Sequence, residues 1–505
     1  MSKKHIIKSA GIIGFATVIS RLLGFLRDIL IAGFFGTRMY AQAFVVAFRI
    51  PNMLRDLIGE GATNAAFVPV LSEYLETKKR EEFWHLANVL LNVILIVLSV
   101  VSLLGIFLSP VIVRFMAPGF ISDSEKFRVT VQLTRLMFPY VLLVGLFAYS
   151  MGILNSLKHF SMPAFAPCIL NISIILCALL KQGSIQALAE GVLIGGVIQL
   201  VVQIPVLAAK GFVPFQKGLY HPAVKKIGVL LVPRILGSCV YQISIFINTM
   251  LASLSNIVGE GGVAALYYAN RIFQFPLAIF GIAVAQAALP TMSRQALEAG
   301  LDRLKATLSF SLKAVNFIMI PSSLGLIVLA RPITSALFER GMFDNYSTVI
   351  TAQALLFYSI GLFSYAGIKI LVSCFYSLKD TFTPVKIASV SLILNILLNV
   401  IFMFPLKVSG LALATSFSAA FNFFSLFFVL RKKIGALGGY EILNSFIRVL
   451  AAGLAMAALI YFCAFKIHLN LFLVISIGII TYPVFTFIFD VKETKDFLKW
   501  ALRRN

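Results

Sequence analysis

Long apolar runs constrain this 505-residue chain more than any other feature of its sequence. A scan with a window of about 19 residues finds about fourteen such runs, near 6–35, 38–75, 84–116, 128–157, 160–181, 184–208, 223–255, 262–292, 306–335, 347–377, 381–404, 408–432, 441–466 and 469–490. About 20 apolar residues are enough for a helix to cross a bilayer. The chain is 60% hydrophobic and only 12% charged, whereas soluble domains are about 25% charged. We therefore predict an all-α polytopic membrane protein with about fourteen transmembrane helices.

The distribution of the basic residues predicts the topology. The net charge is +23, and Lys and Arg gather in alternate connections, such as "ETKKREE", "SLKDTFTPVK" and the tail "KETKDFLKWALRRN". The positive-inside rule places these connections and both termini in the cytoplasm. Topology and attraction to anionic lipids then explain the basic excess, and nucleic-acid binding is not predicted. The first apolar run carries charges and continues past the length of a signal peptide, so we interpret it as a retained helix.

Four sequence matches recur in the same order along the chain. The matches are "SRLLG" at 20–24 with "PRILG" at 233–237, "FRIPN" at 48–52 with "NRIFQ" at 270–274, "GLFAY" at 145–149 with "GLFSY" at 361–365, and "SLKHFSMP" at 156–163 with "SLKDTFTP" at 377–384. They predict two homologous halves, each an even number of spans, related by a pseudo-two-fold axis along the membrane normal. We expect one six-helix bundle at 1–210, a second at 211–434, and two further helices with a basic tail at 435–505. This organisation is typical of transporters that work by alternating access.

Charged residues lie inside several of these apolar runs, beginning with "SRLLGFLRD" at 20–28. A charge at the bilayer centre costs at least a few kcal/mol, so such residues point to function. The first two expected helices carry Arg21, Arg27, Asp28, Arg49, Arg55, Asp56 and Glu60, and the second half adds Arg234 and Arg271. Arginines outnumber carboxylates, and an unbalanced positive charge inside a bundle needs a negative ligand.

Because the guanidinium fork suits phosphate, these arginines predict a central cavity for an anionic, phosphorylated substrate. Two structural alternatives stay open. Arg27 and Asp28, like Arg55 and Asp56, could form local ion pairs, and Arg21 could reach the membrane interface with its charged end.

Other functional motifs are missing from the sequence. It contains no P-loop, no HExxH motif and no Ser/His/Asp cluster, and its five cysteines lack zinc spacing. We therefore predict no metal, no cofactor and no enzymatic activity. The energy for transport would come from an ion gradient, the membrane potential or the substrate gradient.

Several long motifs resemble the MurJ (MviN) family of lipid II flippases in the MOP superfamily. They include "SRLLGFLRD", "AFRIPNMLRDLIGEGATNAAFVPVLSEY", "MPAFAPCILNISI", "YYANRIFQFP" and "FYSLKDTFTPVKIA", and the resemblance runs from about residue 8 to 490. It implies a fourteen-helix fold with two six-helix bundles, and a groove for a lipid tail on the last two helices. It also implies transport of lipid II, the undecaprenyl-pyrophosphate-linked peptidoglycan precursor, to the outer leaflet of the bacterial cytoplasmic membrane. Lipid II, membrane lipids and cell-wall synthesis machinery are the partners it implies.

The resemblance also implies roles for individual residues. The family's essential arginines fall on Arg21, Arg27, Arg55 and Arg271, its acidic partner on Asp28, and the glutamate of its helix 2 "EG" motif on Glu60. We expect these six residues to bind substrate, with Arg27, Arg55 and Arg271 converging on one pyrophosphate. Some members carry carboxylates where this chain has Gln42, Asn270 and Gln274, so we predict no proton-coupling role there.

Glycines in the first two helices offer places to bend. Gly24, Gly59 and Gly61 are candidate hinge residues, although glycine also allows close helix packing. Two other function classes stay open. One is a MOP-superfamily exporter of drugs or of another lipid-linked oligosaccharide, but a cation exporter should carry acidic cavity charges. The other is a membrane enzyme, which no clustered carboxylates support.

Overall fold

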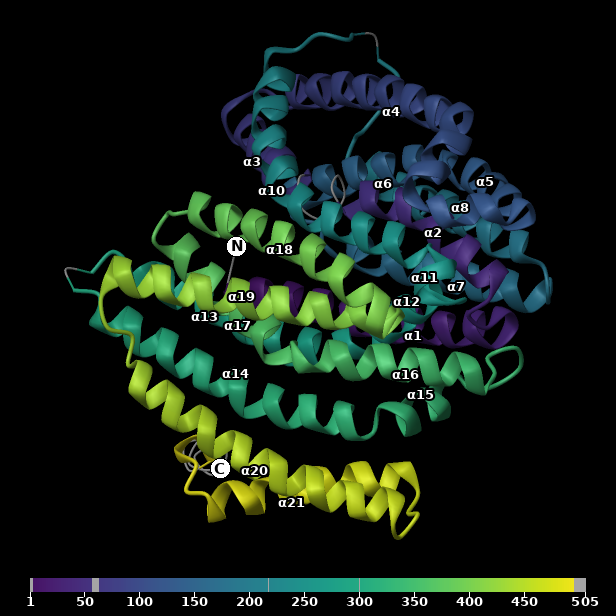
Figure 1. Cartoon of the computed structure of the whole chain (residues 1–505). Helices are drawn as coiled ribbons and strands as arrows, with labels where there is room; N and C mark the ends of the chain where they lie inside the picture. The colour runs from purple at the N-terminus through teal and green to yellow at the C-terminus, as the bar shows by residue number, and fades with distance from the viewer. Residues whose placement is uncertain (1–2, 57–62, 217, 299, 495–505) are drawn as a thin grey trace. The chain divides into compact units, whose positions relative to one another are not determined.

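The structure is a computed structural model of the whole chain (Figure 1). It describes residues 3–56, 63–216, 218–298 and 300–494. Within these ranges the secondary structure is helical and contains no β-strand. The predicted all-α fold class is therefore confirmed.

Every predicted apolar run coincides with one helix or with consecutive helices. Single helices form eight of the runs: α1 (Lys3–Phe35), α4 (Arg80–Met116), α7 (Ser161–Leu180), α10 (Pro222–Ala252), α18 (Phe382–Leu406), α19 (Val408–Ile434), α20 (Gly439–Phe465) and α21 (Leu471–Ile488). Consecutive helices form the other six: α2 (Met39–Arg55) with α3 (Thr63–Thr77), α5 (Ser124–Met137) with α6 (Pro139–Ser156), α8 (Ile185–Val201) with α9 (Ile204–Ala209), α12 (Gly262–Pro276) with η3 (Leu277–Gly281) and α13 (Ile282–Gln295), α14 (Asp302–Val328) with α15 (Ala330–Phe338), and α16 (Asn345–Ile360) with α17 (Leu362–Ser377). The short helices η2 (Pro118–Ser122) and α11 (Ser255–Val258) lie in connections.

Ten of these helices or helix groups are long and apolar enough to cross a membrane, and the pair α16–α17, bent by 44°, makes up to eleven. Among the described residues, α1, α2 with α3, and α10 do not meet that test. Each of these three runs contains arginine, and a charge lowers the hydropathy of a helix strongly. The count of fourteen spans stays a prediction.

Proline and glycine mark several of the helix breaks. Pro139 begins α6 directly after the break at Phe138, where its missing N–H costs no helical hydrogen bond. Gly361 separates α16 from α17. Pro276 ends α12 and is followed by the π-helical turn η3. Because proline removes a backbone donor, such positions are where a long membrane helix bends.

The repeat predicted from the sequence reappears in local hydrogen bonds. Asp123 caps α5 by accepting from the backbone N–H of Lys126, and Asp344 caps α16 in the same way. The hydroxyl of Ser102 donates to Phe138 O, and the hydroxyl of Ser323 donates to the main-chain oxygen of Ser359. In each case the second residue lies 221 positions after the first. Two stretches of chain with little overall identity therefore form the same local structures.

One of the four sequence matches does not follow this spacing. The helix ends in "SLKH" at 156–159 and "SLKD" at 377–380 also lie 221 residues apart, and both close with the same backbone hydrogen bonds. The match of "GLFAY" at 145–149 with "GLFSY" at 361–365 has a spacing of 216 residues. It is therefore out of register with the structural repeat.

The described chain packs as two compact units, 1–255 with 340–343, and 256–339 with 344–505. By packing, α10 belongs to the first unit, although the repeat assigns it to the second half of the sequence. The division at residues 211 and 435 rests on the repeat alone and stays a prediction.

A short segment after α15 belongs to the first unit. Within residues 340–343, the N–H of Met342 donates to Gly33 O near the end of α1, at 2.8 Å. Gly36 and Gly341 both have positive φ angles, +60° and +57°. A Cβ atom at Gly341 would overlap Gly33 O, and one at Gly36 would overlap Met342 O. Glycine at both positions is what lets the two backbones approach each other.

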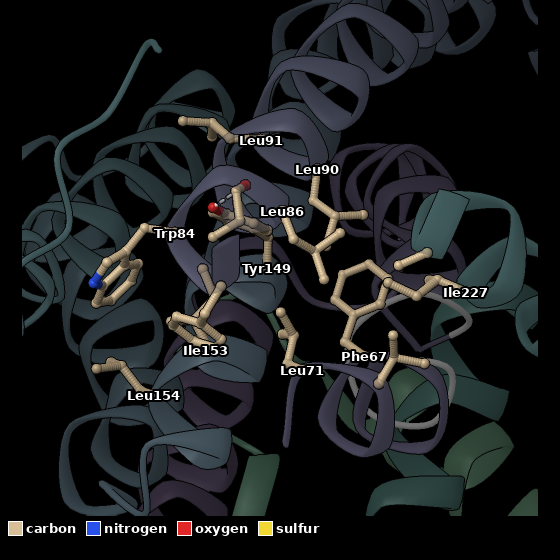
Figure 2. Close-up of a cluster of buried hydrophobic side chains, with 14 of the residues drawn as sticks. Phe67, Leu71, Trp84, Leu86, Leu90, Leu91, Tyr149, Ile153, Leu154 and Ile227 are labelled. Carbon is tan, nitrogen blue, oxygen red and sulfur yellow. Dashed lines mark hydrogen bonds between the residues drawn. The ribbon is translucent and has the colours of Figure 1, made fainter. Parts of the chain in front are cut away.

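The largest apolar cluster of the first unit joins α3, α4, α6 and α10 (Figure 2). Phe67, Leu71, Leu86 and Ile153 are among its buried side chains. The phenol of Tyr149 is also buried there and donates a hydrogen bond of 2.7 Å to Ala87 O. This cluster holds the end of α10 against the α3–α4 pair by apolar contact.

In the second unit, α20 lies alongside α14, and α21 packs against α20 (Figure 1). Buried Leu329, Met456, Ile460 and Val474 contribute to the apolar cluster between them. The phenol of Tyr482 on α21 donates to Phe317 O on α14 at 2.7 Å. The two helices that fall outside the repeat are therefore attached to the second unit through α14.

Candidate substrate-binding site

The innermost charged group of the first unit is the guanidinium of Arg27 on α1. Arg27 is 5% exposed and its neighbour Asp28 is fully buried. Consecutive helical residues point about 100° apart, yet the Arg27 side chain turns back towards its neighbour. Its Nε and Nη2 atoms both donate to Asp28 Oδ1, at 3.1 and 2.8 Å. The sequence alternative of a local ion pair is thus present in the structure.

Asn171 on α7 completes the surroundings of Arg27. Its Oδ1 atom accepts from Arg27 Nη1 at 3.0 Å. Its Nδ2 atom donates to Ser20 O at 3.1 Å and to Pro167 O at 3.2 Å. Because amide oxygen and nitrogen have separate partners here, the amide orientation is fixed by hydrogen bonding. Asn171 therefore holds α7 against α1 and positions the guanidinium.

Sequence reasoning did not single out Asn171, although it lies within the family motif "MPAFAPCILNISI". An asparagine in the middle of an apolar run is the signal that points to it, because buried amides need partners. Gly24 faces this residue, and a Cβ atom at Gly24 would lie 3.6 Å from Asn171 Nδ2, an ordinary contact. The structure thus places the candidate hinge Gly24 in a helix-packing position.

Helix α2 contributes an aromatic ring and two arginines. The Phe48 ring centroid lies 6.0 Å from Arg27 Cζ, at the limit of a cation–π contact. Arg49 Nη1 donates to the hydroxyl of Thr249 on α10 at 2.7 Å. Arg55 at the helix end pairs with Asp56 at 3.1 Å, and both side chains are about 30% exposed. Arg49 therefore links two helices, whereas Arg55 keeps solvent access.

Tyr140 on α6 connects the two candidate arginines of this unit. Its side chain is fully buried, and both Arg27 and Arg55 interact electrostatically with its phenol. Arg27 and Arg55 thus approach the same side of α6. The structure brings Arg27 and Asp28 into one cluster with Asn171, and it places Arg55 towards that cluster.

The remaining predicted site residues differ in their settings. Arg21 lies on α1 before Arg27 and is exposed. Glu60 and the candidate hinges Gly59 and Gly61 fall outside the described residues. In the second unit, Arg271 on α12 donates from Nη2 to the Tyr267 hydroxyl at 3.0 Å, with its Cζ atom 5.1 Å from that ring. An arginine resting on a tyrosine face is held in place and keeps further donors for a ligand.

Membrane-length helices with a buried, hydrogen-bonded arginine between them define a polytopic membrane transporter. Solved structures agree with this class. A multidrug resistance MATE family transporter of the MOP superfamily, in an inward-facing conformation, matches with a TM-score of 0.69, covering 83% of this chain and 95% of that chain. At 15% identity the likeness concerns the fold alone.

Sequence comparison gives the particular family. The family model described as "Lipid II flippase MurJ" matches residues 31–482. The Lipid II flippase MurJ of Burkholderia cenocepacia is 37% identical over 461 residues, 89% of this chain and 88% of that protein. A probable lipid II flippase MurJ of Vibrio cholerae is also 37% identical, over 83% and 82% of the two chains. A structure of Lipid II flippase MurJ in an inward closed conformation matches with a TM-score of 0.82 at 29% identity, covering 94% and 98%. This chain belongs to the MurJ family.

Proposed function

We propose that this chain is a lipid II flippase, a transporter and not an enzyme. Its substrate is the undecaprenyl-pyrophosphate-linked precursor of peptidoglycan, which it moves from the cytoplasmic to the outer leaflet of the membrane. The family match supports the substrate class. The observation that carries the proposal is buried Arg27 within a membrane helix, held by one carboxylate and one amide.

The geometry around Arg27 suits a pyrophosphate that arrives and leaves. Without substrate, Asp28 and Asn171 satisfy the guanidinium, so the buried charge is paired. Phosphate oxygens form the same charge-assisted bonds and carry more charge than one carboxylate. The substrate can therefore replace Asp28 as the partner of Arg27, and Asp28 recaptures the arginine after release.

The full clamp that we propose combines Arg27, Arg55 and Arg271. One guanidinium cannot neutralise a pyrophosphate, and each of these three is positioned by a neighbour, namely Asp28, Asp56 and Tyr267. Exposed Arg21 would attract the substrate rather than hold it. Glu60 is proposed to face this clamp from the end of the second span.

We also propose that both termini face the cytoplasm, in line with the positive-inside rule. The basic connections support this orientation. Arg80 donates to Lys210 O, and Lys226 pairs with Glu73 at 2.6 Å, so basic residues of three connections meet at one end of the first unit. Cysteine labelling of the two termini in intact cells measures the orientation directly.

Single-arginine variants test the proposed function. Purified Arg27→Ala, Arg55→Ala and Arg271→Ala chains should each bind lipid II about ten- to a hundredfold more weakly, because a charge-assisted bond contributes about 1.5–3 kcal/mol. Lysine variants should recover little of this loss, since they keep the charge without the fork. Arg303→Ala is the matched control, because Arg303 is 76% exposed and pairs only with Glu298 at 3.5 Å among the described ion pairs.

Complementation of a strain depleted of its own flippase gives the second readout, together with the leaflet in which lipid II accumulates. Normal binding and growth in all three alanine variants would contradict the clamp. Accumulation of a different lipid-linked oligosaccharide in depleted cells would favour another MOP exporter.

A further inference from the structure

A polar cavity lies in the second unit, where α20 begins and α21 has just ended. Its volume is about 300 Å³. Its lining includes Lys313 of α14, Glu441 and Arg448 of α20, and Lys492 and Glu493 of the segment after α21. Both α20 and α21 are long and apolar enough to cross a membrane. Because the cavity lies at their ends, it lies where a membrane meets water.

One charged group of the cavity is already neutralised by the protein. Arg448 Nη1 donates to the main-chain oxygen of Asp490 at 2.6 Å and to its carboxylate at 2.9 Å. The Nε atom of the same arginine lies 3.3 Å from Asn444 Oδ1. These contacts attach the segment after α21 to α20. Arg448 therefore builds the wall of the cavity.

Glu493 presents a carboxylate with one unused oxygen. The hydroxyl of Ser445 donates to Glu493 Oε1 at 2.8 Å. The other oxygen, Oε2, is shielded from solvent and accepts no hydrogen bond from the described residues. A carboxylate oxygen without a donor is costly to bury. It favours a ligand that brings a cationic N–H donor into the cavity.

Two lysines supply the opposite charge. Lys313 Nζ is 3.6 Å from a carboxylate oxygen of Glu441, which is too long for a good hydrogen bond. The Glu441 side chain is 72% exposed, so this ion pair is weak. Lys492 is exposed at the cavity edge. The lining thus offers ammonium groups for a phosphate and a carboxylate for a separate cation.

We propose that this cavity binds the headgroup of a phosphoethanolamine lipid. Lys313 and Lys492 bind the phosphate, and Glu493 Oε2 accepts a hydrogen bond from the primary ammonium of the lipid. A choline headgroup has the same charges but no N–H donor, and a glycerol headgroup has no cation. The site is separate from the proposed lipid II clamp and does not depend on it.

The surroundings of the cavity suit a membrane lipid. Tyr440 in its lining is 83% exposed, and tyrosine is enriched at the headgroup level of membranes. The last two turns of α21 expose Val484, Phe487 and Ile488. These three residues share one helix face, directly before the segment that contributes Lys492 and Glu493. Acyl chains of a lipid whose headgroup fills the cavity can lie along that face.

Lipid retention by the purified full-length chain tests the site. Native mass spectrometry would count the lipids retained from micelles that contain dioleoyl-phosphatidylethanolamine, dioleoyl-phosphatidylcholine or dioleoyl-phosphatidylglycerol, with inorganic phosphate as a fourth probe. We expect the wild type to bind the ethanolamine lipid at least tenfold more tightly than the choline lipid, and phosphate alone not to compete at millimolar concentration.

Two variants separate the contacts. Glu493→Gln should remove the tenfold preference for ethanolamine over choline and leave binding of the glycerol lipid unchanged. Lys313→Gln should weaken binding of all three lipids about tenfold. Glu76→Gln and Lys466→Gln are matched controls, because both residues are exposed and lie outside the cavity. A melting temperature within a few degrees of wild type shows that each variant is folded.

Three results would overturn the proposal. Equal retention of the ethanolamine and choline lipids by the wild type would show that Glu493 contacts no ammonium. Preference for the glycerol lipid would make the cavity a site for purely anionic lipids. Retention that is identical in wild type and Lys313→Gln would mean that the cavity holds only water.

Discussion

Asn171 offers the sharpest test of how Arg27 is positioned and used. The amide contributes one acceptor to Arg27, at 3.0 Å, and two donated bonds that join α7 to α1. Replacement by alanine removes all three bonds. Replacement by aspartate also removes the two donated bonds, but it puts a second carboxylate beside the guanidinium. The difference between Asn171→Asp and Asn171→Ala therefore reports the interaction with Arg27 alone.

The size of that difference follows from the bond that is changed. A hydrogen bond to a charged group contributes about 1.5–3 kcal/mol, against about 0.5–1.5 kcal/mol between neutral groups. In the aspartate variant both partners are charged, so Arg27 is held about 1–2 kcal/mol more tightly. A pyrophosphate must break that additional interaction before it can bind Arg27. We expect lipid II to bind Asn171→Asp about 5- to 30-fold more weakly than Asn171→Ala.

Binding of lipid II to the two purified variants measures this difference, and complementation of a depleted strain shows its consequence for growth. Asn470→Asp is the control for an added charge, because Asn470 caps α21 at an exposed position and aspartate caps a helix equally well. If Asn171→Asp binds lipid II as tightly as Asn171→Ala, Arg27 is not a substrate contact. The Arg27–Asp28 pair is then purely structural.

Three further predictions concern stability, pH and motion. Gly341→Ala should lower the free energy of unfolding by about 1–3 kcal/mol in thermal melts, because residue 341 has φ +57° and a Cβ there overlaps Gly33 O, whereas Gly228→Ala, which meets open space, should not. The ammonium of Lys433, hydrogen-bonded to Asp380 at 2.6 Å, lowers the pKa of that carboxyl to about 2. The stabilisation is therefore present above the unfolded pKa of about 3.9 and lost as pH falls towards 2. The melting temperature of Asp380→Asn should consequently change less than that of wild type between pH 5 and pH 3, and parallel curves would contradict the assignment. Ala at both Gly59 and Gly61 should slow transport while lipid II binding stays near wild type, and unchanged transport would exclude a hinge at these positions.

Apolar length alone predicted the helical content and the position of every run. This worked because a chain segment in a bilayer has no water to satisfy its backbone, so each long apolar run must be a helix. The breaks inside the runs were less visible. The break at Phe138 and the one at Gly361 depend on a following Pro139 in one case and on packing in the other. Proline is readable in a sequence, whereas a bend imposed by neighbouring helices is not.

The register of the internal repeat shows a second limit. Short matches such as "GLFAY" with "GLFSY" arise readily in apolar helices, because few residue types are used there. The capping pair Asp123 and Asp344 gives the structural spacing of 221 residues. Capping residues are constrained by geometry at a single position. They are therefore better markers of register than apolar letters that only need to be hydrophobic.

The candidate site was predicted by residue type and not by partner. Composition identified Arg27 as unusual, and the ion pair with Asp28 was one stated alternative. Helical periodicity placed Arg27 and Asp28 about 100° apart, whereas the long arginine side chain closes that angle in the structure. Asn171 is 144 residues away along the chain, and a contact of that separation depends on how α7 packs against α1. One sequence holds no information about which distant polar residue completes a buried pair.

The buried Arg27–Asp28 pair has a thermodynamic consequence for transport. A charge that must stay in a membrane protein through a cycle needs a partner in every state, since an uncompensated buried charge costs several kcal/mol. An external partner alone would leave Arg27 unpaired each time the substrate departs. Asp28 is the next residue in the same helix, so it remains within reach however α1 bends or tilts. Placing the counter-ion on the same helix turn therefore lets the substrate bind and leave without an intermediate in which Arg27 is buried alone.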